Sequence, residues 1–189
     1  MSRQVIIGLA AAMGSGKDLA FKIIKKNFPE YHFERVAFAD PIKKAIADIF
    51  KTNVDVINDI KRLDDICITD PNTNDAYCHL SGRDLIRGIG MLMRGYDETQ
   101  FNQYVKKIIG DNPGSNFVIT DVRFANEIEM IHSLGGYIVR IDRDECTYDG
   151  HVSETEIAKP DFIVDNNDDI DHFSHKLCKI VNTIIEGRA

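Results

Sequence analysis

A short glycine-rich segment near the start of the chain carries residue types that bind phosphate. The turn after the apolar run at 5–7 reads Gly14, Ser15, Gly16, Lys17 and Asp18. Backbone N–H groups in such a turn, with the N-terminus of the next helix, cradle the phosphates of a nucleotide. The lysine reaches the β and γ oxygens. The alternative is a plain strand-to-helix turn whose lysine faces solvent.

The match to the usual phosphate-loop pattern departs at two positions. Ala11 stands where that pattern begins with glycine, and Asp18 replaces the serine or threonine whose hydroxyl meets Mg²⁺. The preceding strand, two glycines and the lysine still favour phosphate binding. Asp18 is therefore the candidate metal ligand.

Arginines recur at helical spacing over residues 81–94. At about 100° per residue, Arg83, Arg87, Gly90 and Arg94 fall on one stripe. One guanidinium group can donate two parallel hydrogen bonds to the oxygens of a phosphate. The arginine stripe therefore suits a second phosphate. A glycine inside a helix costs about 1 kcal/mol relative to alanine, which is reasonable where a ligand approaches the backbone. A solvated basic face explains the pattern equally well.

Acidic and basic residues also follow the apolar strand predicted at 116–120. Asp121 is placed like the acidic group that orients Mg²⁺ or its waters in phosphate-loop enzymes. Arg123 and Glu127 are four residues apart on the next predicted helix and could pair, which would aim the arginine. The alternative is a capping aspartate beside a surface ion pair.

Two later loops complete the candidate residues. Residues 142–159 are polar, and a lid over transferring phosphates needs positive charge and must exclude water. Arg143 is the best candidate for that charge, although the loop is net acidic. Asn166 follows the last predicted strand and could hold a purine ring. An Asx turn with helix capping explains that segment as well.

These residues are positioned by alternating strands and helices. The pattern predicts strands at 4–9, 32–39, 116–120, 137–141 and 162–164, with helices at 17–27, 40–50, 81–94, 99–109, 125–134 and 170–185. This is an α/β, three-layer phosphate-loop fold: a parallel sheet of about five strands with helices on both faces. Ligands then bind at the carboxyl ends of the strands.

Length and composition limit the alternatives. The 189 residues predict one domain, 1–189, in which the polar stretch 51–80 is an insertion or flap and 142–159 a lid. The net charge of −7 argues against nucleic acid or an anionic membrane as partner. Four scattered cysteines and no apolar leader favour a cytoplasmic protein with reduced thiols and no zinc site.

Taken together, the motifs resemble the deoxynucleoside monophosphate kinases of tailed phages, within the nucleoside-monophosphate-kinase group. The resemblance spans most of the chain and is weakest over 51–80. Its segments are 15–18, 39–43, the helix with Arg83, Arg87 and Gly90, and 121–127, 134–136, 151–154 and 164–166. Aspartate directly after the loop lysine is typical of this family, so Asp18 supports the resemblance.

The resemblance implies a site for each residue set. Residues 14–18 would hold ATP. The monophosphate pocket would be lined by Arg83, Arg87, Gly90, Met91, Phe101, Asp121, Arg123 and Glu127. Arg87 replaces a common glutamine, Met91 a threonine, Phe101 a tryptophan, and Leu19 the threonine that follows lysine-aspartate.

The expected activity is transfer of the γ-phosphoryl group of ATP to a deoxynucleoside monophosphate, with Mg²⁺ as cofactor. Lys17, Asp121, Arg123 and Arg143 are the expected catalytic residues. The chain could form a homodimer. If it is encoded by a phage, it would act in the host cytoplasm. Two alternatives stay open. Residues 8–17 and 163–166 also resemble dephospho-coenzyme A kinase, and a regulatory module could bind nucleotide without catalysis.

Overall fold

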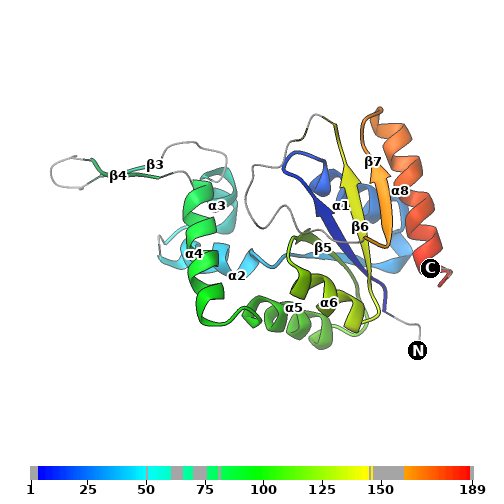
Figure 1. Ribbon diagram of the computed structural model, residues 1–189, viewed down its shortest axis with the longest axis horizontal. Coiled ribbons are helices and arrows are strands. Elements are labelled where there is room, and N and C mark those ends of the chain that lie inside the picture. Colours follow the sequence, from blue (N-terminus) through cyan, green and yellow to red (C-terminus); the bar gives the residue numbers. More distant parts are fainter. Residues whose placement is uncertain are drawn as a thin grey trace. The chain divides into compact units, whose positions relative to one another are not determined.

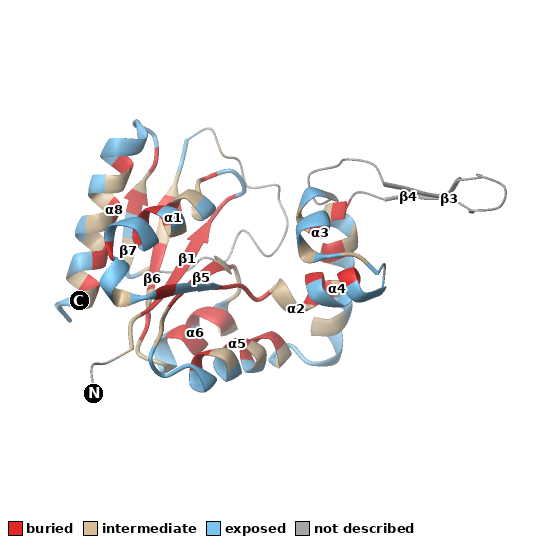
Figure 2. Ribbon diagram, turned by 180° about the vertical axis from the view of Figure 1, so that it is seen from behind, coloured by how far each residue is buried: buried red, intermediate tan, exposed pale blue. Residues whose placement is uncertain are grey.

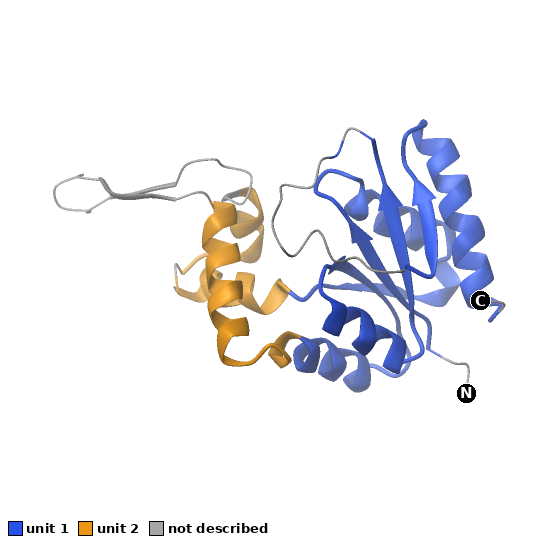
Figure 3. Cartoon of the chain, in the orientation of Figure 1, with its two compact units in different colours: residues 1–38, 102–189 blue, residues 39–101 orange. Residues whose placement is uncertain are grey.

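The structure, a computed structural model, describes residues 4–49, 51–60, 66–69, 76–80, 82–144, 146 and 160–187. The chain forms two compact units (Figure 3): the first contains Met1–Phe38 and Asn102–Ala189, and the second contains Ala39–Phe101. Whether residues 1–189 act as one kinase domain stays a prediction.

The first unit is built on a parallel five-stranded sheet (Figure 1). The strands are β1 (Ile6–Ala11), β2 (Phe33–Val36), β5 (Asn116–Val122), β6 (Tyr137–Asp142) and β7 (Phe162–Asp165). Their order is β2-β5-β1-β6-β7, and every neighbouring pair is parallel. All six residues of β1 are buried, as expected for a central strand covered on both faces (Figure 2).

Helices cover both faces of this sheet. Successive residues of a strand point to opposite faces. On one face, Ile7 and Leu9 belong to a buried cluster with residues of α1 (Lys17–Asn27) and α8 (Ile170–Ile185). On the other face, a Cβ added to Gly8 would lie 2.8 Å from Ile131 Cδ1 of α6 (Ala125–Ser133). The predicted three-layer α/β fold is therefore confirmed.

Two further elements belong with these layers. A single 3₁₀ turn, η1 (Pro29–Tyr31), leads into β2. Helix α5 (Gln100–Asp111) begins in the second unit and continues in the first, where Asn102 Nδ2 donates to the Asn126 carbonyl of α6 at 3.0 Å. None of the described helices has the length and apolar run that crossing a bilayer requires.

The second unit contains three helices and a hairpin. The helices are α2 (Asp40–Ile49), α3 (Val54–Ile60) and α4 (Gly82–Tyr96), and the antiparallel hairpin pairs β3 (Ile66–Thr69) with β4 (Ala76–Leu80). The sequence pattern predicts no helix or strand within 51–80. Helix α3 and the hairpin correct that prediction. Seven residues make two helical turns and strands this short give few alternations, too few for a periodic signal.

Candidate phosphate-binding site

The glycine-rich turn has the backbone that a phosphate loop needs. Gly14 (φ 83°) and Gly16 (φ 102°) both adopt the left-handed conformation, which residues with a Cβ rarely do. Gly16 is the N-cap of α1, and Lys17 is the first residue of that helix. The turn therefore delivers a lysine and the N-terminus of a helix to the carboxyl end of β1, as the sequence predicts.

Lys17 contacts the turn from which it projects. Its Nζ donates to the carbonyl oxygens of Ala11 and Ala12 at 2.7 and 2.8 Å. These contacts place the ammonium beside the turn. A phosphate that binds Lys17 would replace one or both carbonyl oxygens with its own oxygens, which carry more negative charge.

Asn166 connects the last strand to this turn. Its Nδ2 donates to the Ser15 carbonyl at 2.9 Å, and its backbone N–H donates to the Asp142 carbonyl at 2.8 Å. The next residue, Asn167, accepts from the Asp144 N–H at 2.8 Å. The carboxyl ends of β1, β6 and β7 therefore meet at one edge of the sheet. The sequence predicted this edge, but it did not predict the contact between Asn166 and the loop.

An exposed ion-pair group fixes the segment that carries Asn166. Lys176 Nζ on α8 donates to Asp165 Oδ1 and to Asp168 Oδ2, each at 2.7 Å. The hydrogen bond from Lys176 lowers the pKa of Asp165, and the bonds to both carboxylates raise the pKa of Lys176. The turn after β7 is thus tied to α8 as well as to the phosphate loop.

Asp121 and Glu127 both bind backbone N–H groups. Asp121 Oδ1 accepts from the Phe38 N–H at 2.8 Å, which joins the ends of β5 and β2. The buried Glu127 Oε2 accepts from the N–H groups of Arg123 and Phe124 at 2.8 and 3.1 Å. Glu127 therefore stabilises the start of α6. Glu127 is thus bonded to the backbone of Arg123, and the predicted pairing of the two side chains stays a prediction.

The other predicted acceptor residues lie in the second unit. Arg83 and Arg87 are half-buried on α4, and Met91 is 49% exposed. Gly90 is buried, and a Cβ added there would lie 3.2 Å from Ile42 Cδ1 of α2. Close helix packing thus accounts for this glycine without a ligand.

Phe101 at the start of α5 is buried beneath an arginine. The guanidinium carbon of Arg94 lies 4.8 Å from the centre of its ring, within cation–π distance. Arg94 belongs to the predicted arginine stripe, so Phe101 orients one member of that stripe within the second unit. Contact of Phe101 with a monophosphate stays a prediction.

The residues near α1 fit magnesium bound together with a nucleotide. Asp18 is exposed in the first turn of α1. Across the described residues, no three His, Cys, Asp or Glu side chains gather as a metal site. Mg²⁺ usually takes one or two carboxylates together with substrate phosphates and water. The chemistry of Asp18 suits that role.

Parts of the candidate lid fall outside the described residues. Residue 145 and residues 147–159 belong to this group, so the predicted lid is not described beyond Arg143, Asp144 and Cys146. Arg143 is exposed directly after β6. It lies between the two residues, Asp142 and Asp144, whose backbones bond to the turn after β7.

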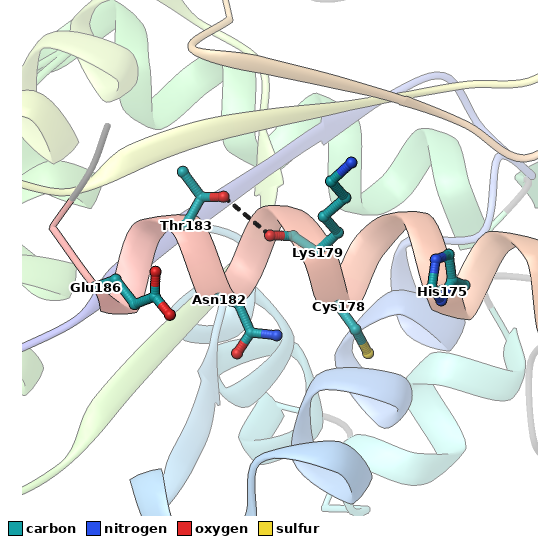
Figure 4. Close-up of a pocket in the computed structure, with 6 residues that line it drawn as sticks. All are labelled: His175, Cys178, Lys179, Asn182, Thr183 and Glu186. Carbon is teal, nitrogen blue, oxygen red and sulfur yellow. Dashed lines mark hydrogen bonds between the residues drawn. The ribbon is translucent and has the colours of Figure 1, made fainter.

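A separate depression lies along α8 (Figure 4). It measures about 370 Å³ and is lined by His175, Cys178, Lys179, Asn182, Thr183 and Glu186. Partial burial raises the pKa of the Cys178 thiol. The lining includes none of the residues predicted to bind nucleotide.

One buried polar residue, Asn102, is not among the residues that the sequence pattern predicts for the site. Asn102 is 7% exposed, although asparagine is usually at the surface. It shares a helical stripe with the buried Val105 and Ile109, at spacings of three and four residues. The helical period predicts an apolar residue at position 102. A polar residue there is the signal that could have identified Asn102 from the sequence.

Comparison with known proteins agrees with this geometry. A protein of Acanthamoeba polyphaga mimivirus, provisionally named a deoxynucleotide monophosphate kinase, is 29% identical over 195 residues, covering 94% of this chain and 96% of the relative. The structure of dephospho-CoA kinase from Campylobacter jejuni superimposes with a TM-score of 0.53 at 15% identity, covering 97% of this chain and 98% of that one. That likeness shows the fold alone.

The family of deoxynucleotide monophosphate kinases matches residues 82–177, just over half of the 189-residue chain. The matched range contains α4 with its arginines, the Asp121–Glu127 segment and Asn166. It ends in α8 just after Lys176, whose ammonium bonds to the turn after β7. This chain is a member of the deoxynucleotide monophosphate kinase family.

Proposed function

We propose that this chain transfers the γ-phosphoryl group of ATP to a deoxynucleoside monophosphate, which gives the diphosphate and ADP. One observation carries the proposal in addition to the family match. A left-handed Gly16 begins α1 at the carboxyl end of a central strand, and Lys17 follows in the first helical turn. This backbone supplies N–H groups and an ammonium to an anion.

The donor half of the reaction belongs to the first unit. The N–H groups of residues 14–18 and the Lys17 ammonium bind the β and γ phosphates. Asp18 would hold Mg²⁺, which would bring positive charge next to the phosphate oxygens when ATP is bound. Little covalent chemistry is needed from the protein, because catalysis of phosphoryl transfer is mostly positioning and charge neutralisation.

The acceptor half draws on three arginines. Arg83 and Arg87 on α4, with Arg123 before α6, hold the phosphate of the monophosphate. Asp121 orients the acceptor, and Arg143 neutralises charge on the migrating group. The remaining lining residues are Gly90, Met91, Phe101 and Glu127. Of these, Glu127 acts through the backbone of Arg123, since it accepts from that N–H group.

A panel of acceptors tests the proposal. Purified protein is incubated with Mg-ATP and each deoxynucleoside monophosphate in turn, with dephospho-coenzyme A as the competing acceptor, and the products are separated by ion-exchange chromatography. We expect ADP and a deoxynucleoside diphosphate in equal amounts. Phosphorylation of dephospho-coenzyme A alone would favour that kinase, while ADP formation without a phosphorylated acceptor would favour a nucleotide-binding regulatory module.

The proposed assembly has a separate measurement. A homodimer predicts twice the 21.4 kDa mass of the chain in sedimentation equilibrium. A single species at the mass of one chain, with full phosphotransfer activity, would remove the homodimer and leave the kinase proposal intact.

A further inference from the structure

The contact between Asn166 and the phosphate loop constrains one peptide group. The Asn166 side chain is almost fully buried, with 7% of the residue exposed. Its amide nitrogen faces the Ser15 carbonyl oxygen at 2.9 Å. Since a carbonyl oxygen only accepts hydrogen bonds, this amide can hold it only by donating.

The orientation of the next N–H follows from peptide geometry. In a planar trans peptide, the C=O of one residue and the N–H of the next point in opposite directions. The Ser15 carbonyl points toward Asn166, so the Gly16 N–H points away from it. Gly16 begins α1, where N–H groups have no partner within the helix and serve anions.

Glycine makes this peptide easy to rotate. Gly16 tolerates both signs of φ, so its own conformation does not hold the Ser15–Gly16 peptide in place. A rotated peptide would turn the Ser15 carbonyl oxygen toward the phosphate and repel it. Asn166 also fills the space beside Gly16, since a Cβ added there would lie 2.6 Å from Asn166 Nδ2.

Asn166 is itself firmly held. Its backbone N–H donates to the Asp142 carbonyl of β6 at 2.8 Å. On either side, Asp165 and Asp168 bond to Lys176 of α8. A side chain anchored on two elements can maintain the orientation of a flexible peptide on a third.

We infer that Asn166 is a positioning residue, whose side-chain amide keeps the Gly16 N–H directed at the phosphates of the donor. The inference rests on the proposed function in taking residues 14–18 as the loop that binds the donor phosphates. It differs from a role in binding the purine ring, because it acts on any phosphate in the loop, with or without a base.

Inorganic pyrophosphate separates these two roles, because it has phosphates and no base. The dissociation constants of pyrophosphate and ATP are measured by calorimetry for the wild type, Asn166→Leu and Asp171→Asn. Leucine has the same number and branching of side-chain heavy atoms as asparagine and no donor. Asp171→Asn is the matched control, since it changes an exposed carboxylate of α8 and leaves the bonds of Asn166 and Lys176 in place.

We expect Asn166→Leu to raise both dissociation constants by the same factor, roughly ten-fold or more, since one charge-assisted hydrogen bond is misdirected. The KM for the monophosphate should stay unchanged, and the control should stay within about two-fold of the wild type. A loss confined to ATP, or no loss for either ligand, would overturn the inference. Wild type that binds pyrophosphate but phosphorylates no acceptor would instead overturn the proposed function.

A second variant covers the case in which Asn166→Leu does not fold. In Asn166→Asp, the new carboxylate cannot donate to the Ser15 carbonyl, but its protonated form can. The ratio of variant to wild-type dissociation constants for pyrophosphate should therefore fall as pH is lowered from about 8 to about 5, toward the range where carboxyl groups gain a proton. A ratio that stays constant with pH would contradict a donating role for residue 166.

Discussion

At the scale of single residues, Lys17 combines a structural contact with its proposed chemistry. Its ammonium donates to two loop carbonyls, at Ala11 and Ala12. Lys17→Met keeps most of the apolar stem and removes both bonds. We expect turnover to fall by several orders of magnitude, while the free energy of unfolding falls by only about 1–2 kcal/mol, since each half-exposed hydrogen bond contributes little net.

Steady-state kinetics and urea unfolding of the same preparation test this prediction. Lys22→Met, an exposed lysine of the same helix, is the control and should leave both quantities unchanged. Turnover near that of the wild type would remove Lys17 from the reaction.

His172 at the start of α8 provides a pH-dependent contact away from the site. Its Nδ1 lies 2.9 Å from Asp169 Oδ2, and this hydrogen bond raises the pKa of His172. The pKa of Asp169 is lowered by the hydrogen bond from the His172 backbone N–H and then by the bond with the ring. A raised folded-state pKa means that the His172 contribution to stability is fully present below the unfolded-chain pKa, about 6.5. It disappears as pH rises through the folded-state value.

An NMR titration of the His172 ring measures this effect directly. The midpoint should lie above about 6.5, and Asp169→Asn should lower it toward that value. Asp171→Asn, an exposed carboxylate of the same turn, should lower it less. Equal effects of the two substitutions would mean that general acidity near the helix N-terminus raises the pKa, rather than the specific bond to Asp169.

At the scale of elements, Gly88 and Gly90 in the middle of α4 have different surroundings. Among the described residues, and apart from the backbone of its own helix, a Cβ added to Gly88 meets no atom within 4 Å, whereas one at Gly90 would lie 3.2 Å from Ile42 Cδ1. Alanine is favoured over glycine within a helix by about 1 kcal/mol. Gly88→Ala should therefore raise the free energy of unfolding by about that amount, and Gly90→Ala should raise it less or lower it.

Thermal and urea unfolding measure the two variants side by side. A lower free energy of unfolding for Gly88→Ala would contradict the open space that the structure shows beside residue 88. If an acceptor nucleotide approaches the backbone at Gly88, the same variant should raise the KM for the monophosphate while it stabilises the protein.

The start of α6 depends on Glu127, which accepts two backbone N–H groups and is 1% exposed. Glu127→Ala leaves two half-buried donors without their acceptor and should destabilise the protein by about 2–4 kcal/mol. Glu127→Gln keeps an acceptor and should cost less. Urea unfolding ranks the variants, and equal losses for both would show that the negative charge matters more than the hydrogen bonds.

Local sequence patterns predict the elements that carry a long or buried period. The five parallel strands and helices such as Lys17–Asn27 are recognisable because apolar residues recur along them. Helix α3 and the β3–β4 hairpin are not, since each is short. The site shows the same division: the glycines and Lys17 have a motif, whereas the bond from Asn166 to Ser15 joins residues 151 positions apart. Only the fold brings such partners together.

At the scale of the whole molecule, the proposed reaction needs a donor and an acceptor that are bound at the same time. The donor loop belongs to the first unit, while Arg83 and Arg87 belong to the second. A bisubstrate ligand, in which adenosine and a deoxynucleoside are joined through five phosphates, offers both halves at once. Once one half binds, the other is present at a high effective concentration, so the linked ligand should bind far more tightly than either nucleotide alone.

Thermal unfolding with each ligand tests this prediction, because a ligand that binds only the folded state raises the Tm, and at equal concentration the tighter ligand raises it more. At equal concentrations, the linked ligand should raise the Tm more than ATP and the monophosphate do together. Arg83→Ala should remove that excess and leave the ATP effect intact, whereas Lys17→Met should weaken both. If Arg83→Ala leaves the excess unchanged, the arginine stripe of α4 is not the acceptor phosphate site, and the acceptor half must be sought around Arg123.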